Sequence, residues 1–442
     1  MNNSEINIIN KLENINTEAI CYWFMTGFFL DGSDFQYNNH DDQELSVLYD
    51  RWYYKPKDIS FEETVIQFTK LFETLVHEHT LGRKIILPLS GGLDSRTLAV
   101  ALRNNKNVVA YSYEFEGGVK ETKYAKMIAD INDWDFHAYV IPKGYLWGKI
   151  DELSEINRCR TEFTHPRQMA VVKQISQLGE VNLSGSMGDL LFETIPSSKN
   201  FKFKNKLDLL RRLIVAPGGE EIAQDLWEHW KIPGSMDNKF NEDIKNLLTN
   251  VNIRNTAGAI RAVKAMHYVK NWTNINMKVF SKYNAVYAPY QDEKMCEFVC
   301  GVPENYLSGR KIQIEYIKSK SPALAKIPWQ QYDLDLYNYG QFNRIYFPRR
   351  VYRFVNRIIS EKIFRKNPLI QRNWELQFLG SKNKEQLKRF LFSNENLYEL
   401  VPEAIIKKYY DLFLNSDNVK YSHPISMLLT FSVWAKRFWI KN

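Results

Sequence analysis

Short apolar runs alternate with segments of helical spacing between residues 84 and 185, and this alternation limits the possible folds. The runs KIILPL, NVVAYSY, DFHAYVI and EVNLSG are typical of strands. The segments between them predict helices over 95–103, 120–131, 144–157 and 166–178. Such alternation favours an α/β fold with a parallel sheet and right-handed crossovers. Ligands of such sheets bind outside the carboxyl ends of the strands.

The flanking regions differ from this core. A capping box of Ser60 and Glu63 precedes a strongly periodic helix. Residues 1–56 read as irregular around one apolar run, AICYWFMTGFFL. Residues 197–255 read as a charged, irregular insertion, and helical patterns dominate from there to the end. We therefore expect an α/β core over about 80–195 and a helical part over about 256–442.

Composition excludes several classes of protein. The chain has 442 residues and a net charge of +8, which is mild for this length and does not indicate a nucleic-acid partner. Its four cysteines lack metal-ligand spacing, so we expect free, mostly buried thiols in a reducing compartment. The polar N-terminus and the lack of an 18-residue apolar run predict a cytoplasmic protein without a transmembrane segment. A basic stretch over 344–388 indicates a solvated amphipathic helix or a patch for an anionic glycan or membrane surface.

The loop SGGLDS, residues 90–95, lies between a predicted strand and a predicted helix. It matches neither the P-loop, which needs a lysine after its last glycine, nor the GxGxxG fingerprint. Gly91 and Gly92 have no Cβ, so their N–H groups can approach an oxyanion at a helix N-terminus. Asp94 would repel a bare phosphate, but it suits a magnesium ion held between carboxylate and phosphate oxygens.

A second loop of the same kind strengthens this interpretation. VNLSGSMGDLLF, residues 181–192, again runs from a strand through Ser184 and Gly185 to an aspartate that opens an apolar run. Alone, either loop could be a simple turn with a helix cap. Two such loops on one sheet would present Asp94 and Asp189 at the same edge, where two carboxylates can hold Mg²⁺ on a triphosphate.

These two loops resemble those of the PP-loop ATP pyrophosphatases, and more narrowly the synthetase domains of asparagine synthetase and β-lactam synthetase. APYQDEKMCEFVCGVPENY (288–306) is similar to a later family segment, and SHPISMLLTFSVWAKRFW (422–439) resembles the last helix of relatives from bacterial surface-polysaccharide loci. The resemblance covers roughly residues 60–440. It implies a PP-loop parallel sheet of the adenine nucleotide α-hydrolase kind, flanked by helices, with ATP and Mg²⁺ as cofactors.

The resemblance also implies roles for residues of this chain. Asp94 and Asp189 would hold Mg²⁺, Ser112 or Tyr113 would lie near adenine, and Ser184 and Gly185 near the activated carboxylate. The pyrophosphate would be cradled by the residues of the first loop, namely Leu89, Ser90, Gly91, Gly92, Leu93, Asp94 and Ser95.

The chain departs from the family in several places. No cysteine follows the initiator methionine, so residues 1–59 resemble a remnant of the glutaminase domain, and residues 60–442 form the synthetase domain. Ser186 stands where asparagine synthetase has glutamate and β-lactam synthetase tyrosine. The late cationic lysine of the family aligns near Gln330, and Lys326 or the pair Arg310 and Lys311 are possible substitutes.

The residue that would act as base for the attacking amine is also unassigned. His165 is one candidate, although a lone histidine more often makes a structural hydrogen bond. A neutral amine would need no base.

The leading hypothesis is an ATP-dependent amide ligase that adenylates a carboxylate, releases pyrophosphate, and transfers the acyl group to ammonia or a small amine. A uronic acid on a nucleotide sugar or growing glycan is the expected substrate, and a separate glutaminase is a possible partner. The alternatives are a peptide macrocyclase or β-lactam-type synthetase, and a degenerate ATP-binding scaffold. A tRNA-thiolating enzyme is disfavoured because the chain lacks the cysteine or zinc spacing of that class.

Overall fold

A five-stranded, fully parallel sheet forms the centre of the α/β part in a computed structural model, which describes residues 12–37, 49–118, 122–195, 205–341 and 378–439. The strand order is β3-β2-β1-β4-β5. Ile85 of β1 pairs with Val108 on one side and Val181 on the other. The strands are β1 (Ile85–Pro88), β2 (Val108–Phe115), β3 (Asp135–Ile141), β4 (Val181–Leu183) and β5 (Ala285–Tyr287).

Helices connect the strands as crossovers, which confirms the predicted α/β fold. The predicted helix before β1 is α3 (Phe61–Thr80), and Ser60 Oγ accepts a hydrogen bond from the Glu63 N–H at its N-terminus. The segment predicted as one helix over 166–178 is instead split into a 3₁₀ turn and a short α-helix. The connecting elements are α4 (Asp94–Ala101), α5 (Thr122–Ile131), η1 (Tyr145–Gly148), α6 (Ile150–Asn157), η2 (Arg167–Ala170), α7 (Val172–Ser176) and α8 (Gly188–Phe192).

Residues 206–250 are helical, so the expectation of an irregular insertion over 197–255 is wrong for this part. They form α9 (Lys206–Ile214), α10 (Gly219–His229) and α11 (Met236–Asn250). In the described residues after α11, helices dominate as expected, and β5 is the strand among them. The elements are α12 (Thr256–Val263), η3 (Lys264–Thr273), α13 (Asn274–Ser281), η4 (Pro289–Gln291), α14 (Glu293–Cys300), α15 (Glu304–Leu307), η5 (Ser308–Arg310), α16 (Lys311–Lys320), α17 (Pro322–Ala325), η6 (Tyr339–Gln341), α20 (Ser381–Phe392), α21 (Glu395–Leu400), α22 (Glu403–Asn415) and α23 (Ser422–Arg437).

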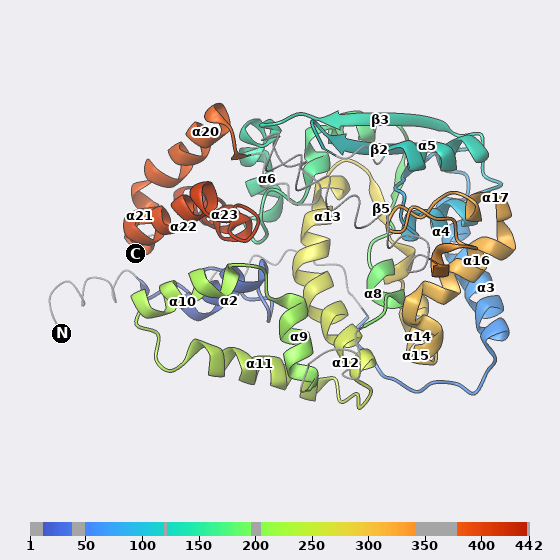
Figure 1. The fold of residues 1–442 in the computed structure, drawn as a ribbon, viewed down its shortest axis with the longest axis horizontal. Coiled ribbons are helices and arrows are strands. Elements are labelled where there is room, and N and C mark those ends of the chain that lie inside the picture. Colours follow the sequence, from blue (N-terminus) through green and yellow to red (C-terminus); the bar gives the residue numbers. More distant parts are fainter. Residues whose placement is uncertain (1–11, 38–48, 119–121, 196–204, 342–377, 440–442) are drawn as a thin grey trace.

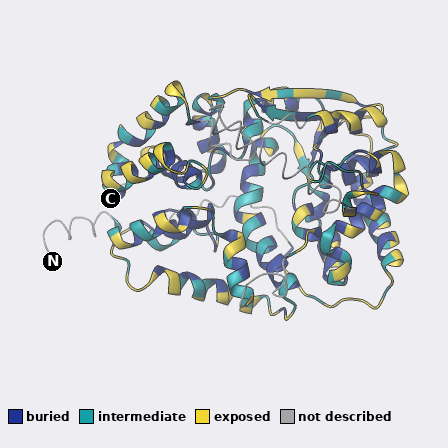
Figure 2. Ribbon diagram, in the orientation of Figure 1, coloured by how far each residue is buried: buried dark blue, intermediate teal, exposed yellow. Residues whose placement is uncertain are grey.

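Two large apolar clusters hold the molecule together, one around the sheet and one among the helices away from it (Figure 2). The apolar run near the N-terminus is not irregular but forms α2 (Thr17–Thr26), which is buried in the helical cluster. The ring of Trp23 lies 6.3 Å from that of Phe431 in α23. Tyr49 and Trp52 belong instead to the cluster around the sheet. Residues before 60 therefore contribute to both cores.

The remaining sequence expectations have mixed outcomes. All four cysteines are free and buried, as expected. Among the described residues, no helix is both long and apolar enough to span a bilayer. Most of the basic stretch over 344–388 lies outside the described residues, and α20 covers part of its end.

Candidate functional site

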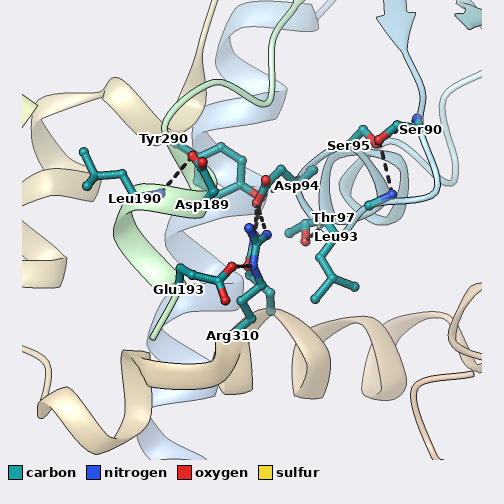
Figure 3. Close-up of polar contacts among 12 residues, drawn as sticks. Ser90, Leu93, Asp94, Ser95, Thr97, Asp189, Leu190, Glu193, Tyr290 and Arg310 are labelled. Carbon is teal, nitrogen blue, oxygen red and sulfur yellow. Dashed lines mark hydrogen bonds and ion pairs between the residues drawn. The ribbon is translucent and has the colours of Figure 1, made fainter. Parts of the chain in front are cut away.

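The first loop leaves β1 and enters α4 at the carboxyl edge of the sheet (Figure 3). The Ser90 N–H donates to Ser95 Oγ at 3.1 Å, and the two hydroxyls also lie 3.1 Å apart. The Gly92 N–H donates to Ser90 Oγ at 3.2 Å. Leu89 and Leu93 are buried in the core beneath the loop. In this loop Ser90 is exposed and Gly92 is half-buried, whereas Gly91 and Ser95 are buried.

A buried arginine fixes this loop to a distant segment. Arg96 donates to the carbonyl oxygens of Ile327 and Pro328 at 2.8 and 2.9 Å, and to that of Gly91 at 3.3 Å. Burial lowers the pKa of Arg96 to about 10, which leaves it charged at neutral pH. The Gln330 N–H donates to the Gly91 carbonyl at 3.1 Å. The neutral Gln330, near which the resemblance implies a lysine, thus lies against the first loop.

The second loop, between β4 and α8, packs directly on the first. A Cβ added to Gly188 would lie 2.4 Å from Asp94 Oδ1, and one added to Gly185 would lie 3.2 Å from Asp94 Cβ. Met187 has a left-handed φ of 76°. The Ser186 N–H donates to Ser184 Oγ at 3.2 Å, and Ser186 Oγ accepts from the Gln291 amide at 3.2 Å. The two loops meet between β1 and β4, which are neighbours in the sheet.

Asp94 lies at the centre of a charged network (Figure 3). Its Oδ1 accepts hydrogen bonds from Arg310 Nη1 at 2.8 Å and from Gln313 Nε2 at 2.9 Å. The same guanidinium donates through Nε to Glu193 at 2.7 Å. Burial raises the pKa of Asp94 above its usual value, Arg310 opposes this shift, and the Asp189 carboxylate adds to it. The network therefore brings together three carboxylates and one arginine beside the two loops.

These carboxylates can still accept a cation. Oδ1 of Asp189 accepts the Leu190 N–H at 2.9 Å. Within the described part of the chain, Oδ2 of Asp94 and Oδ2 of Asp189 accept no hydrogen bond. No group of three or more His, Cys, Asp or Glu side chains forms a metal site there. Two available carboxylate oxygens suit Mg²⁺, which takes one or two carboxylates and completes its shell with phosphate oxygens and water.

The other predicted residues lie at varied positions. Ser112 and Tyr113 are on β2, next to β1, and the Tyr113 hydroxyl accepts the Gln168 amide at 2.9 Å. Lys326 is exposed at the end of α17, and no described contact joins it to either loop. The ring of His165 lies 4.1 Å from that of Trp272. Burial lowers the pKa of His165 to about 3, with a smaller contribution from Arg167, so His165 is a weak base.

Sequence reasoning missed two groups that contact Asp94 and its helix. The Tyr290 hydroxyl donates to the Asp94 carbonyl at 3.3 Å, and the Gln313 amide donates to that hydroxyl at 3.0 Å. Tyr290 belongs to the segment 288–306 that carried part of the resemblance, so its location was a usable signal. Gln313 comes from α16, and nothing in its local sequence indicates a role.

Comparisons with known proteins add the following findings. The model of the asparagine synthase family matches residues 67–313, more than half of the chain. The structure of NMN synthetase from Francisella tularensis is 13% identical and covers 48% of this chain and 94% of its own, but its TM-score of 0.24 is too low to support an argument. No curated protein matches the chain.

Proposed function

The chain belongs to the asparagine synthase family and is thus an ATP-dependent ligase of the PP-loop kind, and from this premise we propose that it adenylates a carboxylate and transfers the acyl group to ammonia or a small amine. The observation that carries the proposal is that the two loops meet. Gly185 and Gly188 of the second loop pack against Asp94 of the first at the carboxyl edge of the sheet. Parallel sheets bind their ligands at such a point between adjacent strands.

The reaction proceeds in two balanced steps. A carboxylate oxygen of the substrate attacks the α-phosphorus of ATP, the bond to the β-phosphate breaks, and pyrophosphate leaves. The amine nitrogen then attacks the acyl carbon, AMP departs with the bridging oxygen, and the nitrogen loses a proton to solvent water to form the amide. The first step requires that the charge on the departing pyrophosphate be neutralised.

The residues around the first loop are suited to holding the phosphates. The N–H groups of Gly91 and Gly92 and the hydroxyls of Ser90 and Ser95 would donate to phosphate oxygens. Mg²⁺, when bound by Asp94 and Asp189, would neutralise phosphate charge. These assignments rest on the hydrogen-bonded loop and on the available carboxylate oxygens.

Other roles follow from position and charge. Arg310 lies next to Asp94 and is the better substitute for the family's late lysine, because Lys326 is exposed and Gln330 is neutral. Ser112 or Tyr113 would contact adenine, and Ser184, Gly185 and Ser186 would border the reacting carboxylate. Because the lowered pKa of His165 makes it a weak base, we propose that the amine arrives in its neutral form.

The amine is not made by this chain from glutamine in our proposal. The cysteine nearest the N-terminus, Cys21, is fully buried in α2, and burial raises its pKa well above the usual value. Such a thiol is a poor nucleophile. Ammonia would come from solution or from a separate glutaminase, or a small amine would serve as second substrate.

We propose a sugar carboxylate, such as a uronic acid, as the acyl donor in capsule or O-antigen synthesis in the cytoplasm. The support is the resemblance of residues 422–439 to relatives from surface-polysaccharide loci. A peptide macrocyclase or β-lactam-type synthetase would use the same site.

The testing experiment combines ATP and Mg²⁺ with uronic acids, nucleotide-uronates, peptides and amino acids, each with ammonium. We expect AMP and pyrophosphate to appear with one class of acid. Release of ADP and phosphate would refute adenylation. Nucleotide binding without turnover across all acids would favour the scaffold alternative.

A further inference from the structure

One continuous helix runs along the second loop and contains a ten-residue π-helical segment. It consists of α12, the π-helix η3 and α13, and it stands between the sheet part and the helical part (Figure 1). In α12, just before η3, Arg261 donates to the Leu190 carbonyl at 3.1 Å. In α13, just after η3, Met277 Sδ accepts a hydrogen bond from the Ser184 hydroxyl at 3.9 Å. The π-helix is thus held against the loop at both ends, and π-helical turns occur frequently at functional sites.

Lys264, the first residue of this π-helix, has an unusual environment for a lysine. Its side chain is half-buried, and its ammonium lies 5.3 Å from the centroid of the Tyr268 ring. Within the described residues the ammonium makes no hydrogen bond and no ion pair. Burial lowers the pKa of Lys264, and the nearby Asp189 carboxylate opposes this shift.

The contrast with Arg261, one turn earlier, is informative. Arg261 is buried, but its guanidinium binds both carboxylate oxygens of Glu304, at 2.8 and 3.2 Å. A charge removed from water without a partner costs free energy, so buried cations are normally paired in this way. The unpaired ammonium of Lys264, beside the second loop, is the arrangement expected of a cation that receives an anion from a ligand.

We propose that Lys264 binds the carboxylate of the substrate and holds it beside the second loop. This inference rests on the proposed function for the identity of the anion as the reacting acid. The Tyr268 ring, which contacts the ammonium on one side, fixes its position through a cation–π interaction. Lys264 also offsets the repulsion that Asp94, Asp189 and Glu193 would exert on an approaching anion.

The first test needs no turnover. The chain, with Mg²⁺ and a non-hydrolysable ATP analogue, is labelled with acetic anhydride, and the modified lysines are mapped by mass spectrometry. Glucuronate is expected to slow labelling of Lys264 at least fivefold, whereas neutral glucose leaves it unchanged. Exposed Lys270, in the same π-helix, is the internal control and should be unaffected. Equal labelling of Lys264 with and without glucuronate, galacturonate, glutamate and acetate would overturn the proposal.

Variants separate this role from simple charge balance with Asp189. Lys264→Met should raise the KM for the active acid at least 30-fold, with the KM for ATP unchanged, and Lys264→Arg should recover part of the loss. Lys270→Met is the matched control. Altered binding of the Mg²⁺-loaded ATP analogue in Lys264→Met, with an unchanged KM for the acid, would show a structural role and refute the inference.

The outcomes also separate this inference from the proposed function. Protection of Lys264 by carboxylates in a chain that releases no AMP with any acid would support the anion site and contradict the ligase. AMP release with an unchanged KM for the acid in Lys264→Met would support the ligase and contradict the anion site.

Discussion

Gly188→Ala is the substitution with the most direct consequence for the site, because it adds one methyl group against Asp94. The added Cβ would lie 2.4 Å from Asp94 Oδ1 and 3.0 Å from a ring carbon of Tyr290. Real Cβ contacts essentially never fall below 3.0 Å, so Oδ1 must move by about 0.6 Å or more. Gly188 is not among the glycines with positive φ, so the methyl group alone causes the effect.

That displacement has two expected costs. Overpacking of a tight contact destabilises by about 1–3 kcal/mol, and here it also stretches the 2.8 Å bond from Arg310 to Asp94. A shift of this size in the carboxylate that we propose to hold Mg²⁺ should lower the rate of AMP release on the order of 100-fold. Stability is measured by urea unfolding, and binding of the Mg²⁺-loaded ATP analogue by calorimetry.

The matched control is Gly148→Ala, where an added Cβ meets nothing within 4 Å. Its unfolding midpoint and nucleotide affinity should equal those of the wild type. If Gly188→Ala behaves like this control in both assays, the contact between the second loop and Asp94 does not exist in solution, and the site as described is wrong.

Three further predictions concern charge. Asp94→Asn and Asp189→Asn should each lower AMP release at least 100-fold without unfolding the chain, whereas Asp133→Asn, on the surface, should have no effect; wild-type rates in either of the first two would remove the magnesium site. Arg310→Met should cost about 2 kcal/mol in urea unfolding, less than a fully buried pair because the side chain of Asp94 is 24% exposed; no loss would mean that the pair is not formed. Because burial lowers the pKa of His165 from 6.5 to about 3, the unfolded chain binds the proton first, and stability falls as pH drops below 6.5. His165→Gln should therefore remove about 1–2 kcal/mol of the stability loss between pH 7 and pH 5, and an unchanged pH dependence would show that the imidazole is accessible to water.

The sequence predicted the strands and helices whose patterns are local and regular. Strands β1, β2 and β4 are apolar runs of mostly buried residues, which favour the interior of a sheet. Strand β3 lies at the edge of the sheet and buries only Ile141, yet its run DFHAYVI was still recognisable as a strand. Strand β5 was missed because its three residues, AVY, are exposed or half-buried and do not form a distinct apolar run. It joins the sheet only because α13 returns the chain to the edge of β4.

Two errors have identifiable physical causes. Charged residues in 206–250 suggested irregular structure, yet Leu209, Leu210 and Ile214 keep helical spacing and bury one face of α9. The run in α2 is apolar on all sides, so it lacks the amphipathic period that reveals a surface helix. A helix of this kind is stable only when its whole circumference is covered, as it is here.

The candidate site also has one part that the sequence predicts and one part that it does not. Both loops could be predicted because each places its glycines, serines and aspartate within a few residues of a strand end. Their partners could not, since Arg96, Gln313 and Arg261 hold the loops through tertiary contacts that no local pattern records. Arg310 was a candidate only by its charge, and its left-handed backbone, with φ of 59°, became apparent only in the fold.

The burial of α2 against α23 has a consequence for synthesis on the ribosome. Phe35, just after α2, stacks on Trp434 of α23 with ring centroids 4.6 Å apart, so a core begun near residue 20 is completed only by a helix near residue 430. At typical translation speeds the intervening chain takes about 20–80 seconds to make. Tyr22 can pack on Trp227 and Phe240 once α10 and α11 have been made, but the face of the core that α23 covers stays open until the end, which makes the nascent chain a client for chaperones that shield apolar segments.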